Sequence, residues 1–143
     1  MTWERTAGAS SAAPPEHVWD VLLDGPRWSS WSAGVDWMTV EGALQPGGLL
    51  TMKPKGAPQT AFRIEAVEPR RLLALAVRFG PVATLRLRWE LAPEAGGTTI
   101  VQTVGIAGPL AGLLLRRAAR RIGDAMPASL ERLAVRAFSL ATA

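Results

Sequence analysis

"APPEHVWDVLLDGPRWSSW", residues 13–31, holds three of the six tryptophans of the chain, although the sequence has only three Phe and no Tyr. Proline suits the first turn of a helix, where its missing N–H costs little, so a helix is expected to begin near Pro15. Apolar residues then recur at helical spacing, and the pair Gly25-Pro26 supplies a stop. The stretch predicts a helix of about ten residues, with these apolar positions: Val18, Val21 and Leu22.

Length and composition limit the classes of protein to consider. The 143 residues are 48% hydrophobic and 20% charged, which fits a globular chain, and we expect a single domain over 1–143. With no cysteine and one histidine, the usual ligands of zinc are missing, so we expect no metal and no cofactor. The N-terminal residues do not resemble a secretory signal, and no apolar run is long enough to span a bilayer. A cytoplasmic protein is therefore expected.

From about residue 27 to Gly108 the pattern changes to a period of two. The clearest case is "ATLRLRWELAP", in which Leu85, Leu87, Trp89 and Leu91 alternate with polar residues. Turn residues separate this run from similar ones, which predicts six or so consecutive antiparallel strands joined as a meander. Other positions expected on the apolar face are Phe62, Ile64, Leu73, Leu75, Val77 and Phe79.

The last third of the chain returns to helical spacing. It predicts one helix of roughly thirty residues, long enough to lie across a whole sheet. Pro127 lies inside this helix, and its ring would clash with the carbonyl of Gly123, so a kink is expected between them. The predicted apolar stripe consists of Leu110, Leu114, Ala118, Ile122, Met126, Leu130, Leu133, Ala137 and Leu140.

The order of elements is strand, two short helices, meander and long C-terminal helix. With the stretches "APPEHVWDVLLDGPRWSSWSAGV", "GGTTIVQTVGIAGPL" and "MPASLERLA", this order resembles the START-like helix-grip superfamily, in its polyketide cyclase/dehydrase and lipid-transport (SRPBCC) branch. The resemblance implies an α+β fold in which a curved antiparallel sheet wraps around the C-terminal helix. It also implies an elongated cavity between sheet and helix, closed at one end by the two short helices.

The resemblance places Trp28 and Trp31 on the second short helix, where they would cap the cavity, whereas Trp19 is expected to anchor the core. The alternative is that all three rings are ordinary packing residues, since buried aromatics contribute strongly to any core. Candidate ligand-binding residues are Trp28, Trp31, Phe62, Ile64, Leu75, Val77, Leu87, Trp89, Gln102, Val104, Ala118, Ile122 and Met126.

Gln102 is the candidate polar group of the cavity, and its direction depends on the register of the last strand. One register places it inside together with Ile100 and Val104, and the other places Thr99, Val101 and Thr103 inside. The similarity to the family pattern "GT..V.Q.V" favours the first register. A buried amide needs a partner, so Gln102 is either bonded within the protein or available to a ligand.

No catalytic motif is evident in the sequence. His17 is the single imidazole, but the first turn of a short helix usually faces solvent. An arginine inside the cavity could stabilise an enolate, although alternation with apolar residues places most of them on the outer face. Asp36 and Glu41 are candidates for the mouth of the cavity. The arginines considered are Arg5, Arg63, Arg78, Arg86 and Arg88.

Four arginines at positions 116, 117, 120 and 121 occur in a segment, residues 110–123, that contains no acidic residue. They account for the net charge of +4, because the other basic and acidic residues balance. Such a patch serves solubility or makes weak contact with anionic lipid headgroups. Nucleic acid is not expected as a partner, since no recognition motif accompanies the arginines.

The sequence thus favours a protein that binds a hydrophobic small molecule, such as a lipid or a polyketide-like compound. One alternative is an enzyme of the cyclase, aromatase or dehydratase type. A second is a membrane- or protein-interaction module that uses the patch Arg116–Arg121.

Overall fold

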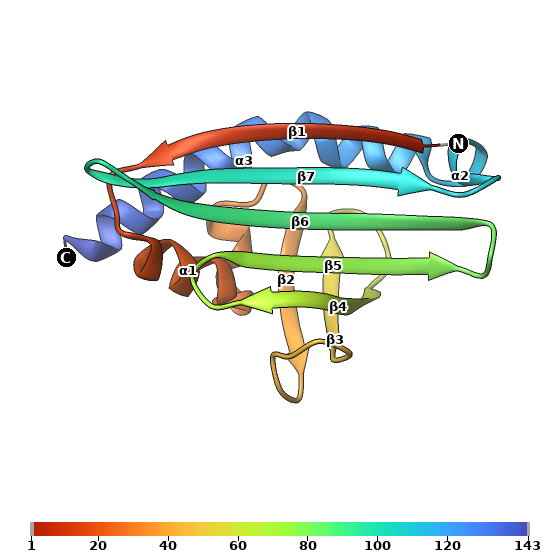
Figure 1. The fold of residues 1–143 in the computed structure, drawn as a ribbon, viewed down its shortest axis with the longest axis horizontal. Coiled ribbons are helices and arrows are strands. Elements are labelled where there is room, and N and C mark those ends of the chain that lie inside the picture. Colours follow the sequence, from red (N-terminus) through yellow and green to blue (C-terminus); the bar gives the residue numbers. More distant parts are fainter. Residues whose placement is uncertain (1, 143) are drawn as a thin grey trace.

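A curved antiparallel sheet wraps around a long C-terminal helix (Figure 1). The computed structural model describes residues 2–142 of the chain. The strands are β1 (Thr2–Ser11), β2 (Val35–Glu41), β3 (Leu49–Pro54), β4 (Thr60–Glu68), β5 (Leu72–Phe79), β6 (Ala83–Glu94) and β7 (Gly97–Ala107). The helices are α1 (Pro15–Leu23), the 3-10 helix η1 (Gly25–Ser30), α2 (Ala111–Leu114) and α3 (Arg116–Ala141). This α+β, helix-grip arrangement confirms the expected fold class.

The sheet has the strand order β1-β7-β6-β5-β4-β3-β2. Strands β2 to β7 pair with their neighbours in sequence, which confirms the predicted meander. The first strand pairs with the last one, from Thr2 opposite Ala107 to Ser11 opposite Thr98. The two ends of the strand-forming region therefore lie side by side.

Alternation along the strands decides which side chains face the helix. In β6, Leu85, Leu87 and Trp89 are buried, whereas Arg86 is exposed, as the sequence predicts. Ala76 is an exception, because it is buried although it lies on the outer face of β5. Its register partners on the two neighbouring strands both carry long side chains, Arg63 and Arg86, which explains how so small a residue can be covered.

The stretch at residues 13–31 folds nearly as predicted. Helix α1 begins at Pro15, ends at Leu23 and is followed by η1, which starts at Gly25. A Cβ atom at Gly25 would lie 1.9 Å from the carbonyl oxygen of Met38, so only glycine allows η1 to approach β2 this closely. The prediction for Trp31 needs a correction, because η1 ends at Ser30 and Trp31 follows it.

The C-terminal helix is shorter than predicted, because α2 and α3 are separate. Leu115 interrupts the helical backbone between them, with φ −118°, so the apolar stripe is not continuous. Leu110, Leu114 and Leu140 are exposed, and near the start of α3 the buried position is Ala119 rather than Ala118. From Met126 onward the predicted stripe is buried, as Leu130, Leu133 and Ala137 show.

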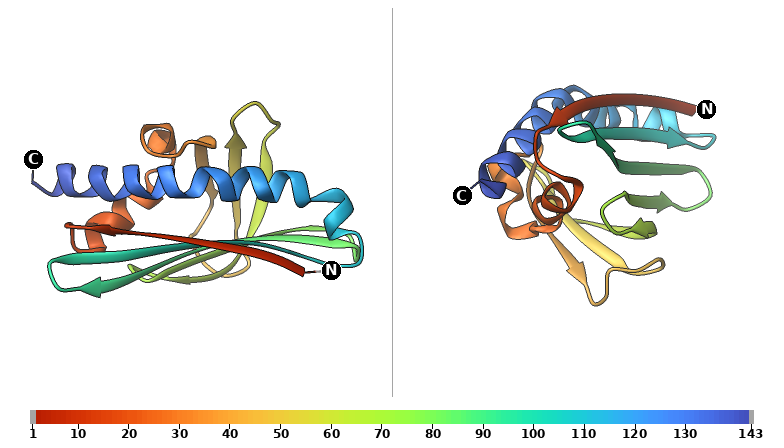
Figure 2. Two further views of the ribbon diagram at one scale, coloured as in Figure 1. Left: turned by 90° about the horizontal axis from the view of Figure 1, so that it is seen from above. Right: turned by 60° about the vertical axis from the view of Figure 1, so that its left-hand side comes forward.

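Pro127 lies within α3, which continues through it as one helix. A local bend at this position stays a prediction. In Figure 2 the helix crosses the concave side of the sheet, with α1 beside its C-terminal part. None of the helices in residues 2–142 combines the length and the apolar character needed to cross a membrane.

Candidate functional site

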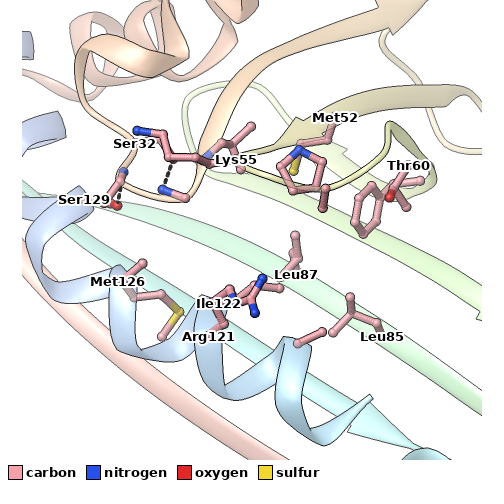
Figure 3. Close-up of a pocket in the computed structure, with 18 of the residues that line it drawn as sticks. Ser32, Met52, Lys55, Thr60, Leu85, Leu87, Arg121, Ile122, Met126 and Ser129 are labelled. Carbon is pink, nitrogen blue, oxygen red and sulfur yellow. Dashed lines mark hydrogen bonds between the residues drawn. The ribbon is translucent and has the colours of Figure 1, made fainter. Parts of the chain in front are cut away.

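A cavity of about 430 Å³ lies between α3 and the concave face of the sheet (Figure 3). Its walls come from η1 and the loop that follows it, from strands β3 to β7, and from Leu115 together with α3. The volume lies within the range of roughly 300–1,000 Å³ that is usual for small-molecule sites. Predicted residues that line it are Trp28, Trp31, Phe62, Val77, Leu87, Trp89, Gln102, Ala118, Ile122 and Met126.

Three tryptophans form the deep end of the cavity. The ring of Trp28 lies 4.8 Å from that of Trp31 and 5.6 Å from that of Trp89, measured between centroids. The indole N–H of Trp28 donates a hydrogen bond to the carbonyl oxygen of Leu22 at 2.7 Å, which ties η1 to the end of α1. Trp28 is therefore a packing residue that also lines the cavity, and its contact with a ligand stays a prediction.

One hydroxyl group of α3 holds the loop after η1 against this helix, and a second hydroxyl bonds within the loop segment. The hydroxyl oxygen of Ser129, which is buried on α3, accepts a hydrogen bond from the backbone N–H of Ala33 at 2.8 Å. The hydroxyl of Ser32 accepts one from the N–H of Val35 at 3.1 Å. Both serines line the cavity, and these bonds fix the wall that they form.

Gln102 is the buried amide of the cavity, with a relative exposure of 6%. Strand β7 places it on the inner face with Ile100 and Val104, which confirms the preferred register. It lies directly opposite Trp89 on β6. No hydrogen bond within residues 2–142 involves its side-chain amide, so two polar atoms at the cavity wall are available to water or a ligand.

The indole N–H groups of Trp31 and Trp89 also lack a hydrogen-bond partner among the described residues, and both are buried. Leaving a buried donor without a partner typically costs about 1–3 kcal/mol. Both rings line the cavity, but the two nitrogens have almost no accessible surface, so these donors belong to the packed interior and are not offered to a ligand.

The mouth of the cavity differs from its deep end because it carries two cations. Lys55 comes from the connection between β3 and β4, and Arg121 comes from α3, which bounds the opposite side in Figure 3. Both residues are exposed, and so is the lining residue Phe79. No Asp or Glu is among the described residues that line the cavity. The mouth therefore has a positive charge that no lining carboxylate offsets.

Three predicted site residues do not line the cavity: Ile64, Leu75 and Val104. They are on the inner face, as alternation requires, but each has 0% exposure and belongs to the packed core. A period of two shows which face a residue occupies; it does not show how far along the sheet the cavity extends.

The other lining residues were not among the candidate ligand-binding residues. Many lie in the loops after η1 and after β3, or on α3 one residue before a predicted stripe position, as Arg121, Ala125 and Ser129 do. Leu85 and Phe79 were expected on the apolar face of the sheet, but not as ligand contacts. The additional lining residues are Ser32, Ala33, Gly34, Val35, Met52, Pro54, Lys55, Ala57, Thr60, Phe79, Leu85, Leu115, Arg121, Ala125 and Ser129.

The polar candidates considered for chemistry lie elsewhere. His17 is half-buried on α1, 4.0 Å from Glu16, and it does not line the cavity. Asp36 and Glu41, the candidates for the mouth of the cavity, do not line it either. Arg5, Arg63, Arg78, Arg86 and Arg88 are all absent from the wall, and the arginine that reaches it is Arg121.

Within residues 2–142, no group of three or more His, Cys, Asp or Glu side chains is placed to hold a metal ion. The groups that can act on a bound molecule are therefore of three kinds. They are the Gln102 amide, the hydroxyls of Ser32, Thr60 and Ser129, and the cations at the mouth. This set can orient a ligand through hydrogen bonds and charge, while the apolar wall removes it from water.

The sequence matches one family model, described as polyketide cyclase / dehydrase and lipid transport, over residues 3–137. Among curated protein sequences, none matches this chain.

Solved structures share the fold at low sequence identity. Protein NE0264 from Nitrosomonas europaea has a TM-score of 0.73 and 17% identity, over 97% of this chain and 96% of that one. Ara h 8.0201 has a TM-score of 0.68 and 12% identity, over 97% and 99% of the two chains. The di-domain ARO/CYC BexL, from the BE-7585A biosynthetic pathway, has a TM-score of 0.67 and 18% identity, over 95% of this chain and 50% of that one.

Proposed function

The chain belongs to the polyketide cyclase/dehydrase and lipid-transport family, and from this premise we propose that it binds a hydrophobic small molecule, a lipid or a polyketide-like compound. The binding site is the cavity between α3 and the sheet. The observation that carries the proposal is the apolar cavity of about 430 Å³ with the unpartnered amide of Gln102 in its wall.

The lining explains why an apolar ligand would be favoured. An empty apolar cavity forfeits dispersion contacts along its wall, so a molecule of matching shape stabilises the folded state when it enters. The rings of Trp28, Trp31 and Trp89 give the deep end a large apolar area. A water-soluble polar metabolite would lose its hydration there and gain few hydrogen bonds in return.

The polar groups add a further requirement to the ligand. Gln102 offers one acceptor and an NH₂ donor at the deep end, and Lys55 and Arg121 offer positive charge at the mouth. A molecule with an apolar body, an oxygen near Gln102 and an oxygen-rich or anionic end toward the mouth would satisfy both. Fatty acids and polyketide-like compounds have this character.

The second candidate function is a cyclase, aromatase or dehydratase reaction on a polyketide-like substrate. It is favoured by the shared fold with BexL, a protein described as an ARO/CYC di-domain, and by the two cations at the mouth, which could stabilise an enolate. However, no carboxylate or imidazole is among the described lining residues to transfer a proton. Binding therefore ranks first.

The binding proposal can be tested without knowing the natural ligand. Freshly purified protein is analysed by native mass spectrometry for a copurified apolar compound. The protein is then titrated with 1-anilinonaphthalene-8-sulfonate, an anionic apolar dye, while tryptophan emission and dye emission are recorded. We expect saturable binding of one dye molecule per chain. The absence of both a copurified compound and saturable dye binding would refute the proposal.

The variant Gln102→Ala separates binding from catalysis, with Thr103→Ala as its matched control on the outer face of the same strand. For a carrier, Gln102→Ala weakens the binding of a copurified ligand, whereas Thr103→Ala leaves it unchanged. For an enzyme, Gln102→Ala loses turnover of a polyketide-like substrate but still binds it.

A further inference from the structure

We infer that α2 and the first turns of α3 form a docking surface for an anionic lipid bilayer, directly beside the mouth of the cavity. The docking surface consists of six residues that are exposed: Leu110, Leu113, Leu114, Arg117, Arg120 and Arg121. It combines apolar side chains that can enter a membrane interface with cations that can contact phosphate groups.

The leucines of the docking surface are not scattered single residues. Leu113 is 81% exposed, Leu114 is 52% exposed, and Leu110 lies directly before α2 with 42% exposure. The buried residue of α2 is Ala111, so this short helix presents its larger side chains to solvent. Several adjacent exposed leucines on one short helix suggest an interaction surface rather than a folding requirement.

The arginines lie next to Leu113. Leu113 lines a surface hollow together with Arg117, Arg120 and Arg121. No ion pair within residues 2–142 involves these three arginines. The hollow has one acidic residue in its lining, Asp124, and this carboxylate is already engaged by Arg5 at 2.6 Å. The local field is therefore strongly positive, which matches an anionic surface.

The leucines favour a bilayer over a nucleic acid. A phosphate backbone would attract the arginines equally well, but it offers no apolar phase for Leu113 and Leu114. At the headgroup region of a bilayer, apolar side chains enter the acyl boundary while arginines stay among the phosphates. Of these two partners, only the bilayer offers favourable surroundings to both the leucines and the arginines of the docking surface.

The position of the surface links it to the cavity. Arg121 lines both the hollow and the cavity, and the cavity residues Leu115 and Ala118 directly follow Leu114 and Arg117 in the sequence. In Figure 1, α2 and the start of α3 lie at the end of the sheet opposite to α1. A bilayer docked at this end would lie beside the mouth, so an apolar molecule would have a short path between membrane and cavity.

The test is co-sedimentation of the full chain with vesicles, with no other apolar compound added. Vesicles of phosphatidylcholine with 30% phosphatidylserine are compared with pure phosphatidylcholine, at low and at high salt. We expect salt-sensitive binding to the anionic vesicles only. The triple variant Arg117→Gln/Arg120→Gln/Arg121→Gln should bind about 100-fold more weakly, since each arginine near such a surface contributes roughly fivefold.

The control variant Arg63→Gln/Arg132→Gln/Arg136→Gln removes the same charge from other parts of the surface and should bind within about twofold of the original chain. The variant Leu113→Ser/Leu114→Ser keeps every charge and should bind at least tenfold more weakly. Circular dichroism spectra verify that each variant is folded. Equal losses for the two triple variants would overturn the inference, because net charge alone would then explain the binding.

Two further outcomes would also overturn it. One is binding to a labelled RNA oligonucleotide in place of vesicles, and the other is a dimer that buries Leu113 and Leu114 between copies. Because the dye titration contains no vesicles, a failure of vesicle binding leaves the binding proposal intact. Failure of the dye titration likewise leaves the docking surface intact.

Discussion

The two halves of α3 cross the same sheet but meet different surroundings. In the C-terminal half, Leu130, Leu133 and Ala137 are fully buried, and α1 packs against this part of the helix. In the N-terminal half, Ala118, Ile122 and Ala125 face the cavity. The strands opposite are apolar in both cases, so the composition of the sheet does not explain the difference.

The difference arises from what covers the concave face. Helix α1 contributes Val18, Trp19 and Leu22 to the core at one end of the sheet. The rings of Trp28 and Trp31 mark the limit of this filled region. Beyond them α3 is the main cover, and its side chains there, which include Ala118 and Ala125, leave space between the helix and the sheet. In a sheet of this length, one pair of short helices fills one end, and a cavity remains at the other.

The largest expected effect contrasts Leu130→Ala with Ile122→Ala. Leu130 has no exposed surface, so its truncation should leave a void and lower the free energy of unfolding by about 3 kcal/mol. Ile122 is half-buried beside the cavity, and its truncation should cost less than about 1 kcal/mol, since the space around it is already open. Urea denaturation measures both values, and equal losses would contradict the contrast.

Enlarging an alanine should have a smaller effect, and again the variant in the C-terminal half of α3 should lose more stability. Ala137→Leu adds volume where there is no space and should cost about 1–3 kcal/mol of unfolding free energy. Ala125→Leu can extend into the cavity and should cost less than about 0.5 kcal/mol. Thermal unfolding compares the two.

The same pair of variants also tests the binding site. Ala125→Leu occupies part of the cavity and should weaken dye binding at least tenfold, whereas Ala137→Leu, if folded, should bind as the original chain does. A strongly destabilised Ala125→Leu would show that the cavity is not available to a side chain.

The smallest effect is expected at the exposed ion pair between Arg5 on β1 and Asp124 on α3, which is 2.6 Å long. Both side chains are substantially exposed, so Asp124→Asn should change the free energy of unfolding by less than about 1 kcal/mol. Urea denaturation of the original chain and of Asp124→Asn, each with and without 0.5 M salt, measures this change in the free energy of unfolding. A loss of several kcal/mol would mean that β1 depends on this pair to stay against the N-terminal half of α3.

The sequence was sufficient to predict the order of the elements and the inner face of the sheet. Periods of two and of 3.6 depend on local geometry, and this explains why the sequence predicts the correct face for Leu85 and Leu87. For Gln102 alternation leaves two registers open, and the family pattern decides between them correctly. The interruption at Leu115 could not be predicted in this way, because no glycine or proline occurs there. The choice of Ala118 over Ala119 has another cause, because both residues lie in α3. The predicted stripe kept a spacing of four residues before Met126, which drifts around a helix of 3.6 residues per turn, and the buried position seven residues before Met126 is Ala119.

The site was predicted less completely than the fold. Wall residues on strands and at the tryptophans followed from alternation and from the family resemblance. Lys55 and Arg121 did not, because Lys55 belongs to a turn and Arg121 has the sequence context of a solvated charge patch. Whether an inner-face residue lines the cavity or joins the core, as Ile64 does, depends on which helix lies above it, and only the three-dimensional packing decides this.

The pairing of β1 with β7 has a consequence for biosynthesis. Thr6 and Thr103, whose hydroxyls lie 3.2 Å apart, are 97 positions apart in the chain. At a translation rate of about 5–20 residues per second, the first strand leaves the ribosome roughly 5–20 seconds before its partner exists. Its sequence, TWERTAGASS, contains no Val, Ile or Leu. A segment with so few β-branched and large aliphatic residues has little tendency to aggregate during the interval before its partner is made.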